Sequence, residues 1–583
     1  MSAARVTTTW VRSFVEELYA AGVREVCIAP GSRSTPLVLA FAEHGSFRMR
    51  VHLDERSASF FALGVGKASG RAAVVVTTSG TAAANLLPAV VEASWGETPL
   101  LLLTADRPHH LRDSDANQSV DQIHLFGRYP RWFADMAPPS DDPAALAHLR
   151  RQAGRAVAAA VGGPAGPVHL NFPFSKPLEP EDGPAGSEPV SLPERDPSLA
   201  VSVRTARCSE EEIDALLQSF EDHPRGVIVA GPSSVPDRLG EAVVRLGAAT
   251  GYPVLADPLS GARFRPDHGA DVIAAYDAFL GDAVVEEALR PGLVLQVGGA
   301  PTSMRLQRFL GGTRADRHVI VDAGARWKDH ALLATDYVQA DAADTLARLG
   351  PRASRTVDGA WRSRWRDAES AARTVLSGPA DAGAAHEGSV AGAVVGALPG
   401  GSTLVVSSSM PVRDLDTFGV PGEAELRVLA NRGASGIDGV VSTAFGVAAA
   451  SGGSPTVCLL GDVAFFHDQN GLLWSRESDA PVVFVLVDND GGGIFHMLPV
   501  AEHEPHFTPY FATPHGLDFS HAARQYGIPW EDVAAEGAAE ALARALRGGR
   551  TAIVRVRTDR AASHVRRREV RETVAGSVRR ALG

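Results

Sequence analysis

The sequence predicts an α/β protein with three doubly wound domains, each built on a parallel sheet. Two observations support this prediction. Apolar strand-like runs alternate with helical patterns along the chain, and polar side chains stand directly after several of these runs. Such alternation is typical of parallel sheets covered by helices. With 583 residues, 45% of them hydrophobic, the chain is long enough for several buried cores.

The first domain is expected over residues 1–185. Its strands are expected at 26–29, 49–53, 73–77, 100–104 and 168–171. Residues 8–15 have the pattern of a capped amphipathic helix and not that of a signal peptide. The Pro-, Glu- and Ser-rich stretch at 177–197 predicts a linker to the next domain.

A middle domain is expected over residues 199–355 and a third domain over 385–583. The middle strands are expected at 227–230, 254–256, 293–297 and 318–321. Those of the third domain are expected at 403–407, 428–430, 456–460, 482–487 and 552–555. A Gly/Ala-rich stretch at 377–385 predicts the second linker, and the basic tail from Arg566 predicts a solvated helix.

Composition excludes several classes of function. The chain has 56 basic and 68 acidic residues, a net charge of −12, which argues against a general binder of nucleic acid or membrane surfaces. No apolar run reaches the roughly 18 residues that a membrane span needs, so we expect a soluble, cytoplasmic protein. Cys27, Cys208 and Cys458 have neither metal-site nor disulfide spacing, and two of them fall in apolar strands as small core residues.

The most informative pattern lies in the third domain. Gly461-Asp462 closes one apolar strand, and Asn489 follows the next strand, ahead of the Gly491-Gly492-Gly493 turn. Open α/β sheets bind ligands at such strand ends. An Asp, an Asn and a backbone carbonyl suit Mg²⁺ that also binds phosphate oxygens, and the glycines allow a diphosphate to approach the backbone. The alternative is a helix cap at Asp462 and a turn at Asn489.

This pair resembles the diphosphate and magnesium motif of the thiamine diphosphate enzymes. The resemblance implies that family's architecture, thiamine diphosphate as cofactor, and Mg²⁺ (or Mn²⁺) held by Asp462, Asn489 and the carbonyl of Gly491. Two departures concern the coordination. Val463 stands where the family often has Gly, and Asp490 stands where a second Asn is usual.

Glu55 follows a predicted strand of the first domain and opens a helix. By position alone it could be a first-turn Glu favoured by the helix dipole. In the thiamine diphosphate enzymes a Glu at this place contacts the cofactor's aminopyrimidine and shares a proton with it, and a partly dry site assists that sharing. The resemblance therefore makes Glu55 the catalytic residue. It also implies at least a homodimer, because first and third domains of different subunits face each other in that family; a homotetramer is equally compatible.

Longer segments resemble one branch of this family, the synthases of menaquinone biosynthesis. These segments are PGSRSTP at 30–36, TSGTAAAN at 78–85, TADRP at 104–108, ANQ at 116–118, NRGASGIDG at 431–439 and GGIF at 492–495. Synthases of this branch are transferases that decarboxylate 2-oxoglutarate and add the succinyl carbanion equivalent to isochorismate in a conjugate addition. The match extends from Pro30 to Pro499 and is weak in the middle domain.

Both substrates carry two carboxylates, and guanidinium groups bind carboxylates in a planar, two-pronged way. The resemblance assigns isochorismate to a set near the first-domain motifs and the succinyl carboxylate to Arg413 and Arg432. The first set comprises Arg33, Arg107, Gln118 and, from the middle domain, Arg305. Ser32 and Asn117 are expected to bind substrate without assignment to either set. Exchange between the sets stays open, and any of these arginines could instead be a surface or ion-pair residue.

Further residues are expected near the cofactor by resemblance. They are Thr78, Ser409, Ser435, Gly436, Ile437, Gly461, Ile494 and Phe495. Ile494 is the candidate for an apolar wedge beneath the cofactor, although core packing explains Ile494 or Phe495 equally well.

Two alternatives remain at this stage. One is another thiamine diphosphate enzyme, a 2-oxo acid decarboxylase or an acetolactate-type synthase. His109-His110 gives it some support, because decarboxylases of the group use a His pair, although a surface pair is the simpler interpretation. The other is a non-catalytic protein on the same fold, since fold alone does not assign function. The joint presence of Glu55, Asp462 and Asn489 argues against it.

Overall fold

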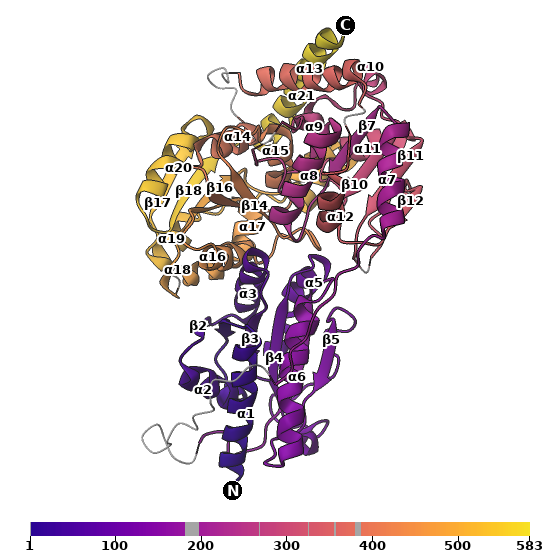
Figure 1. The fold of residues 1–583 in the computed structure, drawn as a ribbon. Helices are drawn as coiled ribbons and strands as arrows, with labels where there is room; N and C mark the ends of the chain where they lie inside the picture. Colours follow the sequence, from indigo (N-terminus) through magenta and orange to yellow (C-terminus); the bar gives the residue numbers. More distant parts are fainter. Residues whose placement is uncertain are drawn as a thin grey trace. The chain divides into compact units, whose positions relative to one another are not determined.

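The computed structural model describes residues 2–180, 198–266, 269–324, 326–354, 357–378, 386–477 and 479–583 (Figure 1). Most of the two predicted linkers, at 177–197 and 377–385, lies outside these residues. The chain forms two compact units. The first comprises residues up to Arg204 with Asn431–Gly453 and His467–Ala480; the second comprises Thr205–Ala430, Ser454–Phe466 and Pro481–Gly583. The three predicted domain boundaries stay a prediction.

Three six-stranded sheets, all parallel, confirm the predicted fold class. The sheet of the first unit has the order β2-β1-β3-β4-β6-β5. Its strands are β1 (Glu25–Ile28), β2 (Arg48–Val51), β3 (Ala73–Thr77), β4 (Leu100–Asp106), β5 (Trp132–Asp135) and β6 (Pro167–Pro173). β3, β4 and β6 are buried along their whole length, as expected for a parallel sheet covered on both faces.

The second unit contains the other two sheets. The middle sheet, in the order β12-β11-β10-β7-β8-β9, consists of β7 (Gly226–Ala230), β8 (Val254–Ala256), β9 (Val272–Ile273), β10 (Leu293–Val297), β11 (Arg317–Val321) and β12 (Asp336–Val338). The third, in the order β14-β13-β15-β16-β18-β17, consists of β13 (Ser402–Val406), β14 (Leu426–Leu429), β15 (Thr456–Gly461), β16 (Val482–Asp488), β17 (Trp530–Ala534) and β18 (Ala552–Arg557).

Four observed strands were not among the sequence predictions: β5, β9, β12 and β17. All four lie at sheet edges. β9 has only two residues, and the other three are only partly buried. An edge strand with one face near solvent lacks the continuous apolar run that identifies a central parallel strand.

Helices cover the sheets. In the first unit they are α1 (Ala3–Ala20), α2 (Thr35–His44), α3 (Glu55–Ser69), α4 (Thr81–Ala84), α5 (Leu87–Trp95), α6 (Pro143–Val161), α16 (Val440–Ala450) and α18 (Trp474–Glu477). The helices between Thr205 and Leu376, in the second unit, are α7 (Glu210–Asp222), α8 (Pro236–Thr250), α9 (Tyr276–Phe279), α10 (Ala283–Ala288), α11 (Met304–Thr313), α12 (Ala342–Leu349) and α13 (Gly359–Leu376). The remaining ones are α14 (Glu387–Ala397), α15 (Met410–Phe418), α17 (Asp462–His467), α19 (Ser520–Tyr526), α20 (Ala538–Arg547) and α21 (Arg560–Leu582).

Both terminal helices differ from their predictions. The N-terminal helix begins earlier than expected, because the side chain of Ser2 caps it by accepting from the backbone N–H of Arg5. The C-terminal segment is helical, as predicted, but it is solvated on one face only. Its Val574 and Val578 are fully buried, and Arg567 is nearly so.

Within the first unit, α3 packs closely against α16. An added Cβ at Gly64 would lie 2.2 Å from the carbonyl oxygen of Thr443, and one at Gly446 would lie 2.0 Å from that of Phe61. The fully buried Asp468 reinforces this pair, since its carboxylate accepts from the backbone N–H of Ser442 at 2.7 Å and from the hydroxyl of Ser57 at 3.2 Å. α3, which begins with Glu55, is therefore held along its length.

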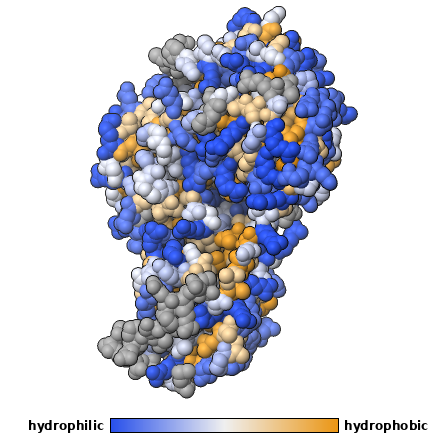
Figure 2. Space-filling view, viewed as in Figure 1, coloured by the Kyte–Doolittle hydropathy of each residue, from blue (hydrophilic) through white to orange (hydrophobic). Residues whose placement is uncertain are grey.

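Among the described residues, none of the helices combines the length and the apolar composition needed to cross a bilayer. Hydrophilic residues cover much of the face seen in Figure 2. Cys27, Cys208 and Cys458 are all buried free thiols, as the sequence predicts for Cys27 and Cys458.

Candidate active site

The first candidate region is the carboxyl edge of the third sheet, at β13, β15 and β16. The chain leaves β13 towards β14 on one side and continues through β15 and β16 on the other, so a topological switch point lies between β13 and β15. Ligands of open α/β sheets bind at such a point. Ser409 follows β13, Asp462 follows β15 directly, and Asn489 follows β16.

The structure brings Asp462 and Asn489 together, as the spacing predicts. The buried carboxylate of Asp462 accepts from the backbone N–H groups of Asn489 at 3.2 Å and of Gly491 at 2.9 Å, and its other oxygen accepts from that of Val463 at 2.7 Å. Gly491 has φ +135°, and a Cβ there would lie 2.1 Å from the carbonyl oxygen of Ala512. Only glycine fits at this position of the turn. We call Asp462, Asn489 and Gly491 the metal edge.

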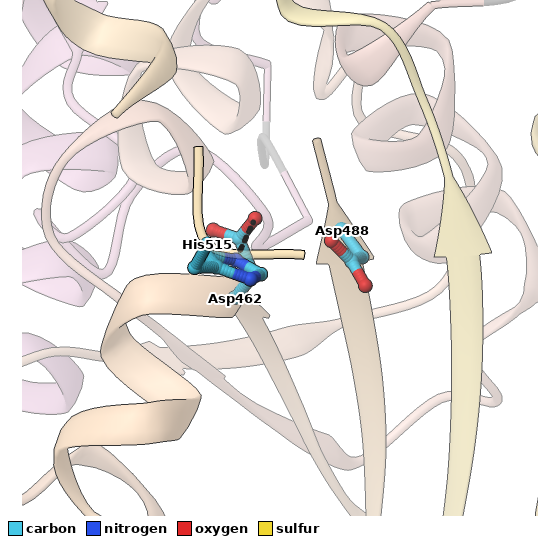
Figure 3. A group of neighbouring side chains, drawn as sticks. All are labelled: Asp462, Asp488 and His515. Carbon is cyan, nitrogen blue, oxygen red and sulfur yellow. Dashed lines mark hydrogen bonds and ion pairs between the residues drawn. The ribbon is translucent and has the colours of Figure 1, made fainter. Parts of the chain in front are cut away.

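His515, which sequence reasoning missed, also contacts Asp462 (Figure 3). Its Nε2 lies 3.2 Å from a carboxylate oxygen of Asp462, while its Nδ1 accepts from the backbone N–H of Leu517 at 3.0 Å. His515 therefore lies within hydrogen-bonding distance of Asp462, and its Nδ1 also lies 3.5 Å from a carboxylate oxygen of Asp490.

Asp488 completes a group of three possible metal ligands with Asp462 and His515. Its carboxylate is already engaged, because the Nε and Nη2 atoms of Arg555 both lie 2.7 Å from its Oδ2. Its other oxygen, Oδ1, accepts from the backbone N–H of Asp490 at 3.2 Å. Both oxygens of Asp488 thus already have partners, and the ligand set of Asp462, Asn489 and Gly491 stays a prediction.

The side chain of Asn489 fits a metal ligand. It is 8% exposed, and its Oδ1 has no hydrogen-bond partner in the described parts of the chain. Its Nδ2 donates to Glu387 at 2.8 Å. An unpartnered buried oxygen is costly, and a hard cation beside Asp462 would satisfy it.

Burial raises the pKa of Asp462 to about 6, and the nearby charge of Asp488 adds to the rise, while the N–H donors of Gly491 and Val463 oppose it. The anion is therefore poorly solvated in the chain alone. A bound cation would stabilise that anion, which is a second respect in which these residues suit a metal.

Further residues that the sequence predicts near the cofactor or a substrate also belong to the second unit. Ser409 has φ +69° at the start of α15, and its carbonyl oxygen accepts from Arg413 at 2.6 Å. Ile494 is half-buried, and Phe495 packs against Phe511 with ring centroids 5.8 Å apart. Arg305 is on α11 of the middle sheet, where it donates to the carbonyl oxygen of Leu280 at 2.6 Å.

The second candidate region is the carboxyl edge of the first sheet, which has the same kind of switch point between β1 and β3. The turn after β1 meets the turn after β3, since an added Cβ on Gly31 would lie 2.3 Å from the Cβ of Thr78. Ser32 is exposed here, whereas Arg33 is only 7% exposed. The two motifs that carry the resemblance are thus adjacent.

Arg33 has the features of an anion-binding residue. Its Nη1 donates to the carbonyl oxygen of Phe174 at 2.8 Å, but its Nε has no partner within the described residues. Burial lowers the pKa of Arg33, and the positive charge of Arg107 lowers it further. Two guanidinium groups that repel each other at a partly dry edge favour a negatively charged ligand.

Arg107, Asn117 and Gln118 meet in the loop after β4. Arg107 donates through Nε and Nη2 to the carbonyl oxygen of Asn117, at 3.0 and 2.6 Å. Gln118 has φ +58° and exchanges two hydrogen bonds with Ser79, each of 2.9 Å. The loop is therefore tied to the turn after β3.

A buried amide pair that the sequence did not identify supports this edge. Gln122 accepts from the backbone N–H of Gly80 at 2.9 Å and donates to Asn171 at 2.8 Å. Asn171 in turn donates to Asp106 and Asp135 at 2.8 and 2.9 Å. We call Ser32, Arg33, Thr78, Arg107 and Gln118 the arginine edge.

Glu55 belongs to the same unit. It is half-buried at the first position of α3, which Asp54 caps, and it accepts from Asn85 at 3.2 Å. Its helix starts where the sequence predicts. His109 and His110 are both exposed, in agreement with a surface pair.

The loop at 431–439 is also part of the first unit. The buried Glu92, another residue missed from sequence, accepts from the backbone N–H groups of Gly433 and Ala434 at 3.0 and 2.7 Å and pairs with Lys67 at 3.1 Å. This carboxylate fixes the backbone from which Arg432, Ser435, Gly436 and Ile437 extend.

The predicted site residues therefore divide between the units. Glu55, the arginine edge, Asn117, Arg432 and the 435–437 turn belong to the first, while the metal edge, Arg305, Ser409, Arg413, Ile494 and Phe495 belong to the second.

Three family descriptions match the chain. "Thiamine pyrophosphate enzyme, N-terminal TPP binding domain" matches residues 8–125, "Middle domain of thiamine pyrophosphate" matches 199–406, and "Thiamine pyrophosphate enzyme, C-terminal TPP binding domain" matches 421–556. The terminal matches contain Glu55 and the Asp462–Asn489 pair, respectively.

Curated relatives match over almost the whole chain. The chain is similar to proteins named 2-succinyl-5-enolpyruvyl-6-hydroxy-3-cyclohexene-1-carboxylate synthase from three organisms. The relative from Halorubrum lacusprofundi is 43% identical over 99% of each chain, and that from Roseiflexus castenholzii is 44% identical over 96% of this chain and 97% of the relative. The relative from Geobacillus thermodenitrificans is 45% identical over 89% of this chain and 88% of the relative. The chain therefore belongs to the thiamine diphosphate enzymes and, among them, to the 2-succinyl-5-enolpyruvyl-6-hydroxy-3-cyclohexene-1-carboxylate synthase family.

Proposed function

We propose that the chain converts 2-oxoglutarate and isochorismate into 2-succinyl-5-enolpyruvyl-6-hydroxy-3-cyclohexene-1-carboxylate and CO2, a step of menaquinone biosynthesis. The observation that carries the proposal is the full-length similarity to synthases of this name. The metal edge and the arginine edge support it, because the reaction needs a diphosphate cofactor and a site for several carboxylates.

Thiamine diphosphate and Mg²⁺, or Mn²⁺ in its place, are the proposed cofactors. Asp462, Asn489 and the carbonyl of Gly491 would hold the metal, while the turns at Ser409 and Gly461 would face the diphosphate. When bound, thiamine diphosphate supplies the electron sink that lets a 2-oxo acid lose CO2 and react as a nucleophile.

Glu55 is the proposed proton donor and acceptor. Its carboxylate stands at the start of a helix that is packed through Gly64 and Gly446, so its position is fixed by the backbone. A residue in this role moves one proton at the cofactor's pyrimidine ring, and Asn85, which donates to it, orients the carboxylate.

Arginines bind the substrates in this proposal. The two substrates together bring four carboxylates, of which one leaves as CO2, so the site must neutralise a large negative charge. Arg33, Arg107, Gln118 and Arg305 are assigned to isochorismate, and Arg413 and Arg432 to the succinyl end. Ser32 and Asn117 are assigned to substrate binding in general. The unpartnered Nε of the buried Arg33, judged within the described residues, favours an anionic ligand there.

We further propose that the active form is a homodimer or homotetramer in the cytoplasm. Native mass spectrometry tests the subunit count, and cell fractionation tests the location.

Product analysis by mass spectrometry tests the function. The full chain with 2-oxoglutarate, isochorismate, thiamine diphosphate and Mg²⁺ should yield the expected adduct and CO2, and omission of any component should abolish the adduct. Release of a free aldehyde with no need for isochorismate would instead indicate a simple decarboxylase. As a binding control, thiamine diphosphate at about 100 times its Kd should stabilise the chain by roughly 2.7 kcal/mol.

A further inference from the structure

Glu387, at the first position of α14, contacts the metal edge from a distant part of the chain. It is 3% exposed, and its Oε1 accepts from Nδ2 of Asn489 at 2.8 Å. Neither residue is near the other in sequence. The contact leaves Oδ1 of Asn489 as the atom without a partner among the described residues.

The other oxygen of Glu387 faces a positive charge. Its Oε2 lies 3.8 Å from Nη2 of Arg567 on α21, and the same nitrogen donates to the buried Asp414 on α15. The backbone N–H of Glu387 donates to the hydroxyl of Ser563, also on α21, at 3.3 Å. The carboxyl group is thus held at its backbone and on both oxygens.

An asparagine amide has two ends of almost equal size, and only one of them can bind a cation. The oxygen offers lone pairs, whereas the NH2 group has none to give. A side chain free to rotate by half a turn about its last bond would present the wrong end part of the time. Something must select the orientation before a metal ion arrives.

We propose that Glu387 is a positioning residue that fixes the Asn489 amide with its oxygen towards the metal. An ionised carboxylate only accepts hydrogen bonds, so it pairs with the NH2 end of Asn489 and excludes the oxygen end from that side. This inference rests on the proposed metal site and adds a residue that the family motif does not contain. Hydrogen-bonded partners of metal ligands commonly change metal affinity by roughly 10- to 100-fold.

The substitution Glu387→Gln would reverse the selection. The amide that it introduces would turn its oxygen towards Arg567, since that guanidinium can only donate. The NH2 group of the introduced amide would then face the NH2 group of Asn489. Two donors repel, so Asn489 would rotate and direct Nδ2 to the metal instead of Oδ1.

Mn²⁺ is the probe for the test, because its EPR signal reports free ion directly. We expect Glu387→Gln to raise the Mn²⁺ Kd of the full chain with saturating thiamine diphosphate by roughly 10- to 100-fold. Glu387→Asp keeps the charge beside Arg567 but shortens the side chain by one methylene, so it should weaken Mn²⁺ binding as well. A Kd within twofold of the unmodified chain for both variants, in folded protein, overturns the proposal.

A matched control separates orientation from general loss of packing. Glu369 is also buried, at 7% exposed, and accepts from two backbone N–H groups of the middle sheet region and from Arg373. Glu369→Gln should leave the Mn²⁺ Kd unchanged. An equal loss in Glu369→Gln would show that any buried Glu to Gln change has this effect, and would refute the assignment.

A double-mutant cycle tests whether the loss of Mn²⁺ affinity depends on an amide at position 489. Asn489→Asp has no amide to orient and sets two carboxylates against each other. Adding Glu387→Gln to that variant should therefore weaken Mn²⁺ binding by much less than it does in the native background. The same loss in both backgrounds overturns the proposal. If the unmodified chain binds no Mn²⁺ with thiamine diphosphate, the proposed metal site itself fails, which is a separate result.

Discussion

The metal edge and the arginine edge occupy equivalent positions on two sheets of similar strand order, yet they are built differently. At the metal edge the carboxylate of Asp462 receives three backbone N–H groups from its own strand end and the next one, and His515 besides. At the arginine edge, Arg33 reaches the carbonyl of Phe174, a residue 141 positions away, and its Nε has no partner among the described residues.

This difference indicates how each edge would bind its ligand. The metal edge is organised by the chain before any ligand is present, apart from one oxygen of Asn489. At the arginine edge, the Nε of Arg33 has no partner among the described residues, and a carboxylate from a substrate would accept from it. A variant at the metal edge should therefore act through cofactor and metal affinity, whereas one in the other unit should act through turnover or substrate affinity.

The largest expected effect comes from Glu55→Gln. General acid–base groups contribute roughly 10²–10⁴ in rate, so turnover should fall by that factor. Cofactor and metal affinity should stay within about twofold, since the metal edge is untouched. Hydrogen–deuterium exchange at C2 of the bound cofactor, followed by NMR, should slow in parallel; exchange at the native rate would remove Glu55 from its assigned role.

The next effect separates the two substrates. A hydrogen bond to a charged group is worth about 1.5–3 kcal/mol, or roughly 10- to 150-fold in affinity. Arg33→Ala should raise the KM for isochorismate by such a factor while single-turnover CO2 release from 2-oxoglutarate alone survives. Arg413→Ala should impair that CO2 release instead.

Single-turnover rates with and without isochorismate check this pair of expectations. Loss of CO2 release in Arg33→Ala, with retention in Arg413→Ala, would reverse the assignment of the two arginines. The enzyme class would stand in that case, but the arginine edge would no longer be the isochorismate site.

The smallest expected effect concerns Asp468, which ties α3 to α16 in the first unit. Burial raises the pKa of Asp468 to about 6, although hydrogen bonds from Ser442 oppose the rise. Between its ordinary pKa and about 6 the folded chain binds more protons than the unfolded chain, so this group's contribution to stability falls as pH rises. Asp468→Asn removes the titration.

Melting temperatures of the native chain and Asp468→Asn check that sign. From pH 5 to pH 7 the variant should gain about 1 kcal/mol relative to the native chain. A difference that stays constant over this range would mean that the Asp468 carboxyl titrates alike in both states.

The fold was largely predictable because central parallel strands are continuous apolar runs. β3, β8 and β10 were predicted to the residue. The edge strands β5, β9, β12 and β17 were not, since a strand with few neighbours needs no such run. The true extent of the first helix depended on a cap at Ser2, which lies ahead of the apolar pattern.

The metal edge was predictable for a related reason. Two strands that are consecutive in the chain and adjacent in the sheet place Asp462 and Asn489 together, so spacing alone locates them. Glu387, His515 and Glu92 reach the two regions from distant segments. Each has an ordinary local setting, such as a helix start for Glu387, so no pattern in the sequence distinguishes it from a solvent-exposed residue.

The role of α21 has a consequence for synthesis of the protein. Arg560 donates to the carbonyl oxygens of Asn489 and Asp490, and Arg567 pairs with Glu387, so the last helix of the chain holds a turn formed about 70 residues earlier. A ribosome makes this helix after every strand of the third sheet. We therefore expect the turn at Asn489 and Asp490 to be fixed only after all the strands of this sheet have been synthesised.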